Sequence, residues 1–454
     1  MKRIFLLIIL ISNTAIFAQV NPKKCITTKL VKGELEHNQE YDFMRQKLVK
    51  YQENNKNIIS KNQVLITIPV VVHVVHRVQD NLGNNTNIPN IQIVDQLRIL
   101  NEDYSKTNPE FPNPPRNTFI DNAGNPELQF CLATIDPDGN PTTGITRTPT
   151  SQLSWDADDN NEANYMKLTS QGGIDNWDPL RYLNIWVCNL TNSSGGGQTL
   201  GYAYLPGLQG NNNQSWKDGL VVDYQFFGTT GSVSASSDGR TATHEIGHYL
   251  GLNHTFCEEY DAQGNPICCD NDNDSWWGGN VDDTPACKDI YFGIVTSNTS
   301  NNTCNDVSYS NIFNTNVLDM DENYMSYAFN TWMFSEGQAE LMLATLNAST
   351  IQGGRRDLWQ NSTVTVNCSG SVEIHDNAKS NLYLYPNPSK GRVFMNSSIQ
   401  YSNISIYNIV GEKISLKKPK TENMLDISNL SNGIYFINLN TEKGIITKKI
   451  ILDK

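Results

Sequence analysis

Three histidines and a glutamate lie close together in the chain, at His244, Glu245, His248 and His254. Residues four apart project from the same face of a helix, so His244 and His248 can bind one metal ion together. Gly251 suits the left-handed backbone that ends a helix, so the chain can turn back and bring His254 in as a third ligand. Three neutral imidazoles around Zn²⁺ leave one coordination position open to water. The segment therefore predicts a catalytic zinc site.

Glu245 follows the first ligand directly and is expected to face that water. Zinc lowers the pKa of a bound water towards ~7, so Glu245 can accept its proton as a general base and pass it to a leaving amine. A bare His-Glu-x-x-His occurs by chance, and three histidines can also be satisfied inside a core helix. Three of only seven histidines fall at this fixed spacing, which argues against both alternatives.

A second segment reads Asn323-Tyr324-Met325-Ser326-Tyr327. A three-histidine motif with a downstream methionine turn is the metzincin pattern. In that pattern Met325 lies beneath the metal as a hydrophobic base and is not a ligand. The Tyr327 hydroxyl can stabilise the oxyanion of a tetrahedral intermediate. The alternative for Tyr327 is an aromatic side chain that only packs.

The elements that must position these residues are both strands and helices. A nearly continuous β-branched run at 66–76 predicts a buried strand, and apolar periodicity predicts a helix at 94–104. Ser335 is a suitable N-cap for a later helix. The chain is therefore predicted to be an α+β protein, with further strands at 128–135, 182–190 and 220–224 and helices at 240–252 and 335–347.

The N-terminus has the pattern of an export signal. A basic start at Met1-Lys2-Arg3 precedes an apolar run and small residues at Ala15 and Ala18, which predicts a secretory signal peptide over residues 1–18. The alternative, a membrane anchor, needs about 20 apolar residues, and this run is shorter. Residues 19–62 are polar, with one helical stretch at 39–52, and are interpreted as a pro-segment with little material for a core.

Net charge and the C-terminal composition limit the class of protein further. A formal charge of −13 disfavours nucleic acid and a polybasic membrane anchor as partners, and no other stretch is apolar enough to form a transmembrane anchor. Residues 353–380 are rich in small polar side chains and are interpreted as a linker. Short alternating strands over 381–454 predict a small β-sandwich. The domain between pro-segment and linker spans 63–352.

Export also changes how the nine cysteines are interpreted. Disulfides form outside the cytosol, and an odd number leaves at least one thiol unpaired or paired between chains. Cys25 stands alone, so it is expected to be the unpaired one. The other cysteines include a dense cluster at Cys257, Cys268, Cys269, Cys287 and Cys304.

The segment HEIGHYLGLNHTF at 244–256 resembles the zinc motif of the pappalysin family of metzincins. Further similarity lies in FCLA (130–133), YLNIWVC (182–188), LGYAYLP (200–206), DDTP (282–285) and NYMSY (323–327). The resemblance covers about residues 65–350. It implies a twisted mixed sheet with helices above the cleft, an irregular lower subdomain, zinc-dependent endopeptidase activity on proteins or peptides, and disulfides after the zinc helix.

The family resemblance also implies structural calcium. Asp272, Asp282, Asp283 and Thr284 offer the hard oxygen ligands that Ca²⁺ prefers. The alternative is a solvated acidic loop that binds no ion.

Cys25 resembles the pro-segment cysteine of relatives held latent by a cysteine switch, in which a thiolate occupies the open zinc position. A latent zymogen is therefore expected, with Cys25 as a zinc ligand. An intermolecular disulfide or an idle thiol are the alternatives.

Two positions depart from the family. Some relatives carry Asp in the substrate pocket six residues after the turn methionine and Cys at the next position, where this chain has Thr331 and Trp332. A preference for Arg in the specificity pocket at Thr331 is therefore not expected. Cys131 and Cys188 are a candidate disulfide pair.

The tail resembles the C-terminal sorting domain of the type IX secretion system, on YPNPSKG (385–391), ISIYNIVG (404–411), LSNGIYFI (430–437) and the basic Lys448-Lys449. This resemblance implies a Bacteroidetes-like Gram-negative source, the type IX machinery as partner, and a location outside the cell or on the outer-membrane surface. A carbohydrate-binding or adhesion sandwich is the alternative for the tail. For the whole chain, the alternatives are an adhesion protein on an inactive peptidase scaffold and a zinc enzyme acting on another bond.

Overall fold

The computed structural model describes residues 23–59, 65–111, 113–193, 197–209, 214–269, 281–310, 312–360, 363–368, 383–396, 401–408, 413–414, 424–441 and 444–454. The expected signal peptide lies outside these residues. Within the described part of the chain, no helix is both long and apolar enough to cross a membrane.

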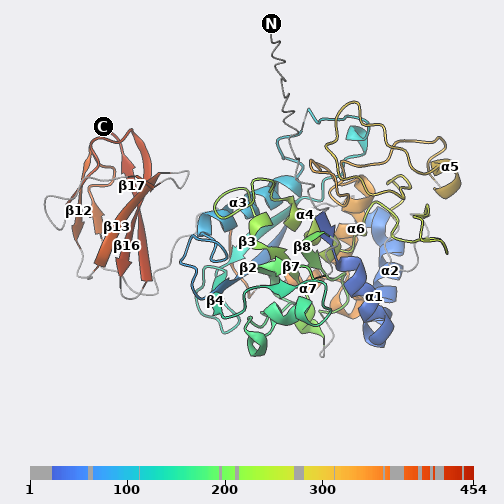
Figure 1. Cartoon of the computed structure of the whole chain (residues 1–454), viewed down its shortest axis with the longest axis horizontal. Coiled ribbons are helices and arrows are strands. Elements are labelled where there is room, and N and C mark those ends of the chain that lie inside the picture. Colours follow the sequence, from blue (N-terminus) through green and yellow to red (C-terminus); the bar gives the residue numbers. More distant parts are fainter. Residues whose placement is uncertain are drawn as a thin grey trace, which may run out of the picture.

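A mixed sheet forms the body of the larger domain (Figure 1). Its strand order is β1-β8-β9-β6-β2-β3-β10, and β4 also pairs with β2. The strands are β1 (Lys23–Cys25), β2 (Ile66–Arg77), β3 (Leu128–Ala133), β4 (Ile145–Thr150), β6 (Leu183–Cys188), β8 (Gln198–Ala203), β9 (Leu220–Asp223) and β10 (Val366–Asn367). A separate two-stranded sheet joins β5 (Trp155–Asp156) to β7 (Leu190–Thr191).

Strand β2 organises the sheet because it is long and almost wholly buried. It runs parallel to β3 near its start, to β4 near its end, and to β6 along its other edge. β-branched side chains pack well on a pleated surface covered on both faces, which is why the apolar run at 66–76 forms this strand. The strand predicted there is confirmed.

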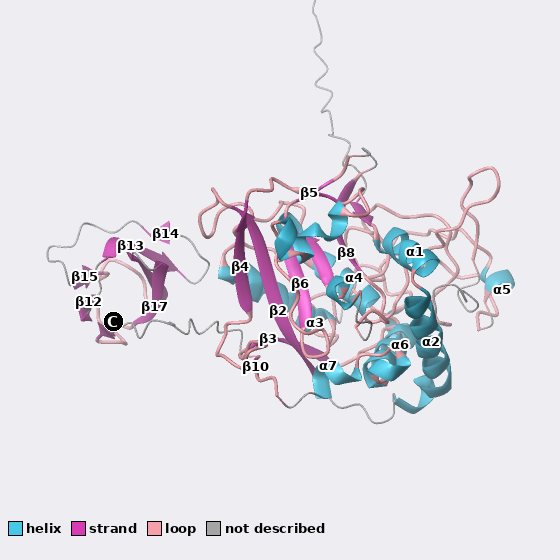
Figure 2. Ribbon diagram, turned by 90° about the horizontal axis from the view of Figure 1, so that it is seen from below, coloured by secondary structure: helices cyan, strands magenta, loops and turns pink. Residues whose placement is uncertain are grey.

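Seven α-helices accompany these strands in the described residues (Figure 2). They are α1 (Thr27–His37), α2 (Gln39–Ile59), α3 (Asn90–Asp103), α4 (Arg240–Tyr249), α5 (Asp306–Tyr309), α6 (Glu336–Asn347) and α7 (Arg356–Gln360). Apolar residues of α3, α4 and α6 share one core cluster with β2, β3, β6 and β9. The α+β class predicted from the sequence is confirmed.

Helix α6 begins where the sequence predicted. The Ser335 side chain accepts a hydrogen bond from the backbone N–H of Gln338, and the Gln338 side chain bonds back to the Ser335 backbone. This reciprocal arrangement satisfies two N–H groups that would otherwise lack partners at the helix start.

The segment before β2 packs more closely than its composition suggested. One helix was expected at 39–52, but α1 and α2 both form, and Tyr41 and Leu48 are fully buried. The Tyr41 hydroxyl donates to Leu205 O at 3.0 Å, and Gln52 Nε2 donates to Thr345 Oγ1 at 2.8 Å. The side chains of this segment therefore pack against apolar surface on other elements of the domain.

The linker predicted at 353–380 also differs, because its first part belongs to the larger domain. Arg355 donates to both carboxylate oxygens of Asp218 at 2.8 Å and to Tyr249 O at 2.7 Å, and both charged side chains are 1% exposed. Its guanidinium lies 3.3 Å from the centre of the Tyr249 ring. Helix α7 and strand β10 follow, so the part of the chain that packs on the larger domain extends to residue 368.

A disulfide closes this extension. Cys368 bonds to Cys131 in β3, so the predicted pairing of Cys131 with Cys188 is wrong. Strand β2 lies between β3 and β6, which separates these strands by roughly 10 Å. A disulfide needs Cα atoms within about 7 Å. Cys188 is accordingly a buried free thiol.

The C-terminal region forms two small antiparallel sheets around their own core (Figure 1, red). One contains β11 (Tyr383–Tyr385), β12 (Arg392–Asn396) and β15 (Met424–Asp426). The other contains β13 (Tyr401–Asn408), β14 (Lys413–Ile414), β16 (Gly433–Thr441) and β17 (Gly444–Leu452). Apolar side chains from both sheets meet in that core, so the β-sandwich predicted for this region is confirmed.

Replacing Arg355 by Met should lower the free energy of unfolding by about 3–5 kcal/mol, because Asp218 is left as an uncompensated buried charge. Urea unfolding measures this loss. Arg98→Met is the matched control: Arg98 pairs with Asp95 and Glu102 at the surface, and its loss should cost under about 1 kcal/mol. Equal losses in the two variants would contradict the importance assigned to the buried pair.

Candidate metal centre and active site

Helix α4 carries the first two histidines on one buried face, with His244 8% and His248 2% exposed. The helix ends at Tyr249, and Gly251 two residues later has a φ of +104°, which lies in the left-handed region. A Cβ there would also lie 3.1 Å from Thr345 Oγ1. Both the backbone angle and the limited space therefore favour glycine at this position. The chain reverses and returns His254 to the same place, as predicted.

The three imidazoles converge through their Nε2 atoms. His254 Nε2 lies 3.2 Å from both His244 Nε2 and His248 Nε2. Tetrahedral bonds of about 2.0–2.1 Å to zinc imply a nitrogen spacing of roughly 3.3 Å, so the donor set fits this ion. With Cys25 Sγ the four ligand atoms lie within 4.8 Å of one another, and they form the only such His/Cys/Asp/Glu group among the described residues.

Each histidine is fixed by a partner for its other ring nitrogen. Nδ1 of His244 lies 2.7 Å from Tyr324 O, and Nδ1 of His248 lies 2.8 Å from Leu252 O. Burial lowers the pKa of His244 to about 3 and holds that of His248 well below its usual value. Both rings are therefore neutral, with Nδ1 as the donor and the Nε2 lone pair available to a metal.

The methionine turn lies directly under α4. Met325 is fully buried, and a Cβ added to Gly247 would lie only 2.4 Å from Met325 Sδ. The turn is held by Asn323, whose side chain exchanges two hydrogen bonds with Gln338 at the start of α6. Met325 thus lies against the helix that carries His244 and His248.

Glu245 points into the centre beside β8. It is 1% exposed, and burial raises the pKa of its carboxyl to about 8. The Thr27 hydroxyl and the Cys25 thiol each lie 3.4 Å from Glu245 Oε2. A carboxyl group in this environment can exchange a proton near neutral pH.

Cys25 reaches the histidines because β1 pairs in parallel with β8. Tyr327 holds it there: its hydroxyl accepts from Cys25 N at 2.9 Å and donates to Cys25 O at 3.4 Å. Burial, followed by the nearby Glu245, holds the pKa of the Cys25 thiol well above its usual value. A metal ion reverses that preference, since a coordinating thiol is deprotonated.

Several supporting residues were not anticipated from the sequence. The Asp103 carboxylate accepts from Tyr324 Oη and from Thr243 Oγ1 at 2.7 Å each, which links α3 to α4 and the methionine turn. Burial raises the pKa of Asp103 to about 6, although Arg240 opposes that rise. An isolated Asp at the end of a predicted helix gives no sequence signal for this contact.

Glu258 is a further residue that the sequence did not single out. Its Oε2 lies 2.9 Å from Nδ1 of His254, the third candidate ligand. Burial alone would raise the pKa of Glu258, but His254, Thr28 and Lys32 together lower it. The i, i+4 spacing from His254 was visible, but it lies in a loop, where that spacing has no fixed meaning.

The positions that depart from the family lie beyond the methionine turn. Thr331 is 5% exposed. Trp332 is fully buried and packs edge-on against Phe111, with ring centres 5.1 Å apart. An aromatic contact is therefore made at the position where some relatives carry a cysteine.

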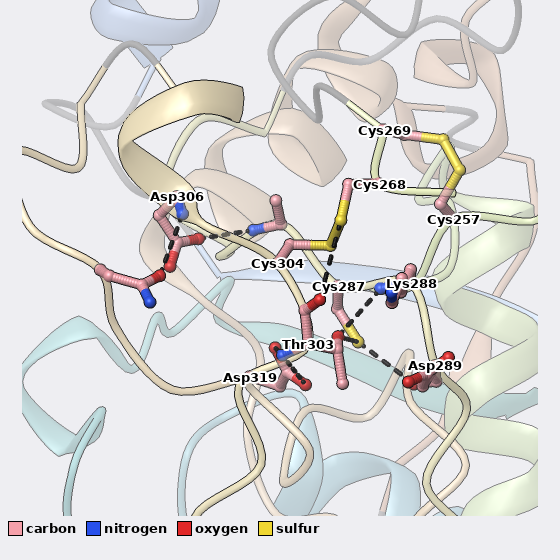
Figure 3. Close-up of a disulfide and its surroundings, with 12 residues drawn as sticks. Cys257, Cys268, Cys269, Cys287, Lys288, Asp289, Thr303, Cys304, Asp306 and Asp319 are labelled. Atoms are coloured by element: carbon pink, nitrogen blue, oxygen red, sulfur yellow. Dashed lines mark hydrogen bonds between the residues drawn. A yellow bond between two sulfur atoms is a disulfide. The ribbon is translucent and has the colours of Figure 1, made fainter. Parts of the chain in front are cut away.

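The loop after α4 is held by two disulfides, Cys257–Cys269 and Cys268–Cys304 (Figure 3). Cys287 lies nearby as a buried thiol, 3.2 Å from Asp289 O and 3.7 Å from Thr303 Oγ1. All nine cysteines lie in the described residues, and three of them, Cys25, Cys188 and Cys287, are free thiols, so Cys25 is not the only unpaired cysteine.

Three of the four residues predicted to bind calcium, Asp282, Asp283 and Thr284, are consecutive in one turn. Asp272 lies outside the described residues. Asp283 accepts from Ser335 Oγ at 2.6 Å and from Gly337 N at 2.8 Å, so it stabilises the start of α6. Thr284 is 5% exposed, and Asp282 lies beside it in the same turn.

Comparison with known proteins agrees with the fold and the histidine site. A family model described as pregnancy-associated plasma protein-A, peptidase M43, matches residues 169–347, and a secretion system C-terminal sorting domain matches 383–453. Mature mirolysin from Tannerella forsythia, solved with a cleaved peptide, is 33% identical, with a TM-score of 0.52; the match covers 66% of this chain and 97% of that chain.

Two further relatives extend the comparison. A promirolysin mutant of the same species is 30% identical, with a TM-score of 0.55, over 74% of this chain and 96% of that chain. An extracellular metalloprotease of Arthroderma benhamiae is 29% identical over 60% of this chain and 75% of its own length.

The mixed sheet, the three convergent histidines and these relatives define an extracellular metalloprotease, and they do not favour an inactive adhesion scaffold. The chain belongs to the pappalysin family and carries a secretion sorting domain at its C-terminus.

Replacing Gly247 by Ala should cost about 1–3 kcal/mol of stability, because the added methyl group displaces Met325 from beneath the site. Peptide hydrolysis by the activated enzyme should fall as the histidines shift. Gly33→Ala in α1 is the control for stability, measured on the intact chain, since nothing lies within 4 Å of a Cβ there. A destabilisation by Gly33→Ala as large as that by Gly247→Ala would contradict this role for the Met325 contact.

Proposed function

We propose that the chain is a zinc endopeptidase whose metal ligands are His244, His248 and His254. The observation that carries this proposal is the 3.2 Å distance from His254 Nε2 to the Nε2 atoms of both His244 and His248, combined with an acceptor for every Nδ1. When bound, zinc polarises the scissile carbonyl and lowers the pKa of a water molecule towards ~7.

Glu245 and Tyr327 act on the substrate in this proposal. The Glu245 carboxylate accepts a proton from the attacking water and later delivers it to the nitrogen of the leaving amine. A carboxyl group suits both roles, because the group is deprotonated first and protonated afterwards. Tyr327 keeps its hydroxyl proton and donates a hydrogen bond to the oxyanion, while Met325 supports the ligands from below.

We propose that the intact chain is latent. Cys25 Sγ completes the four-atom group with the histidines, and Tyr327 and Glu245 are both engaged by the same segment. The pro-segment therefore occupies the ligand position and contacts both catalytic side chains at once. Removal of residues 19–62 frees all three.

The domain boundaries proposed are a signal peptide at 1–18, a pro-segment at 19–62, a catalytic domain from 63 and a sorting domain over 381–454. The packing of Arg355 and the Cys131–Cys368 disulfide support extending the catalytic domain from 352 to 368. The sorting domain supports export through the type IX machinery to the medium or the outer-membrane surface. Calcium on the acidic loop and the absence of an Arg preference at Thr331 stay predictions.

Replacing Glu245 by Gln should reduce hydrolysis of a protein substrate by about 10²–10⁴-fold, because the general base is lost. Zinc content, measured on the same preparation by metal analysis, should be unchanged. Glu259→Gln, which alters an exposed carboxylate after the zinc helix, should keep full activity. Near-normal hydrolysis by Glu245→Gln would exclude the proposed base.

Replacing Cys25 by Ala should raise the peptidase activity of the intact chain by more than about tenfold, since a contact with a charged group is worth about 1.5–3 kcal/mol. Activity is measured with a quenched fluorescent peptide before any cleavage of the pro-segment. Cys188→Ala removes another buried free thiol and should leave latency intact. Latency that survives Cys25→Ala would count against the thiol as the blocking group.

A further inference from the structure

The three candidate ligands differ in what holds their second ring nitrogen. Backbone carbonyls hold His244 and His248, whereas a carboxylate oxygen of Glu258 lies 2.9 Å from Nδ1 of His254. A carboxylate partner fixes the orientation of a ligating imidazole and makes its other nitrogen more basic, which strengthens the metal bond.

The same oxygen of Glu258 is also the point where the pro-segment is attached. The Thr28 hydroxyl in α1 donates to Glu258 Oε2, the atom that faces His254. The Glu258 side chain is 31% exposed, and a cavity beside it is lined by Thr28, Lys32 and His254. Residues of the pro-segment and of the zinc site thus share one acceptor atom.

We infer that Glu258 is a positioning residue that orients His254 towards the metal and, in the intact chain, anchors α1 over the site. This inference rests on the proposed zinc site and deepens it. Glu258 acts through His254 and through Thr28. Release of α1 removes the Thr28 contact but leaves the His254 contact in place. Glu258 therefore still orients His254 in the activated enzyme.

Two contacts on one carboxylate predict two separable effects. Loss of the carboxylate weakens zinc binding both before and after activation. Loss of the Thr28 hydroxyl weakens only the attachment of α1, because residue 28 is absent from the activated enzyme.

The first measurement is zinc affinity by chelator competition, in the Glu245→Gln background to prevent self-cleavage. Glu258→Ala should weaken zinc binding by about 10–100-fold, the range found for lost partners of metal ligands, and Glu258→Gln by less. Glu259→Gln is the matched control and should bind zinc as the parent does. Thermal unfolding with zinc present checks that each variant is folded, and Glu258→Gln serves if Glu258→Ala is not.

The second measurement is the basal activity of the intact chain at saturating zinc, with Glu245 present. Thr28→Val should raise this activity about tenfold, since a hydrogen bond to a charged group is lost. A merely structural role for Thr28 would lower stability without raising basal activity.

Zinc affinities of Glu258→Gln and Glu258→Ala equal to that of Glu259→Gln would overturn the inference. His254→Ala identifies the cause of such a result. If His254→Ala still weakens zinc binding, the metal site stands and only the role of Glu258 is lost. If it binds zinc as the parent does, the proposed site itself is wrong. Unchanged basal activity in Thr28→Val would remove the anchoring role.

Discussion

Three imidazoles that converge through Nε2 are held in place by the partners of their other ring nitrogens, Nδ1. In this chain each partner comes from a different segment: Leu252 follows the end of α4, Tyr324 precedes the turn methionine, and Glu258 lies in the loop held by the Cys257–Cys269 and Cys268–Cys304 disulfides. Buried donors require acceptors, so these contacts fix where the three segments lie. The methionine turn is then tied to α6 through Asn323 and Gln338. The metal site is thus the place where the lower half of the domain joins the sheet.

Features encoded by short spacings could be predicted from the sequence. The His244-to-His254 segment, the buried strand β2 and the Ser335 cap each depend on residues a few positions apart, where helix and strand periodicity apply. The position of Met325 followed from its pairing with the histidine motif. The spacing of the histidines thus predicted the candidate metal ligands, but it did not predict the side chains that surround them.

Contacts between distant segments could not be predicted in this way. Cys131 pairs with a residue that composition assigned to a linker, and no local pattern distinguishes that partner from Cys188. Asp103 and Glu258 act because folding brings them beside Tyr324 and His254. The pro-segment was also underestimated, because Tyr41 and Leu48 are buried on apolar surface supplied by other elements. Local hydrophobic content underestimates a segment that packs onto a neighbour and has no core of its own.

The Cys131–Cys368 disulfide joins residues 237 positions apart. Helix α4, the methionine turn and the loop held by the other two disulfides all lie inside the covalent ring that it closes. A single proteolytic nick in any surface loop of that ring leaves both fragments joined through sulfur. Self-digestion therefore has to cut twice before a piece of the active site can diffuse away, whereas one cut after residue 368 is enough to release the tail.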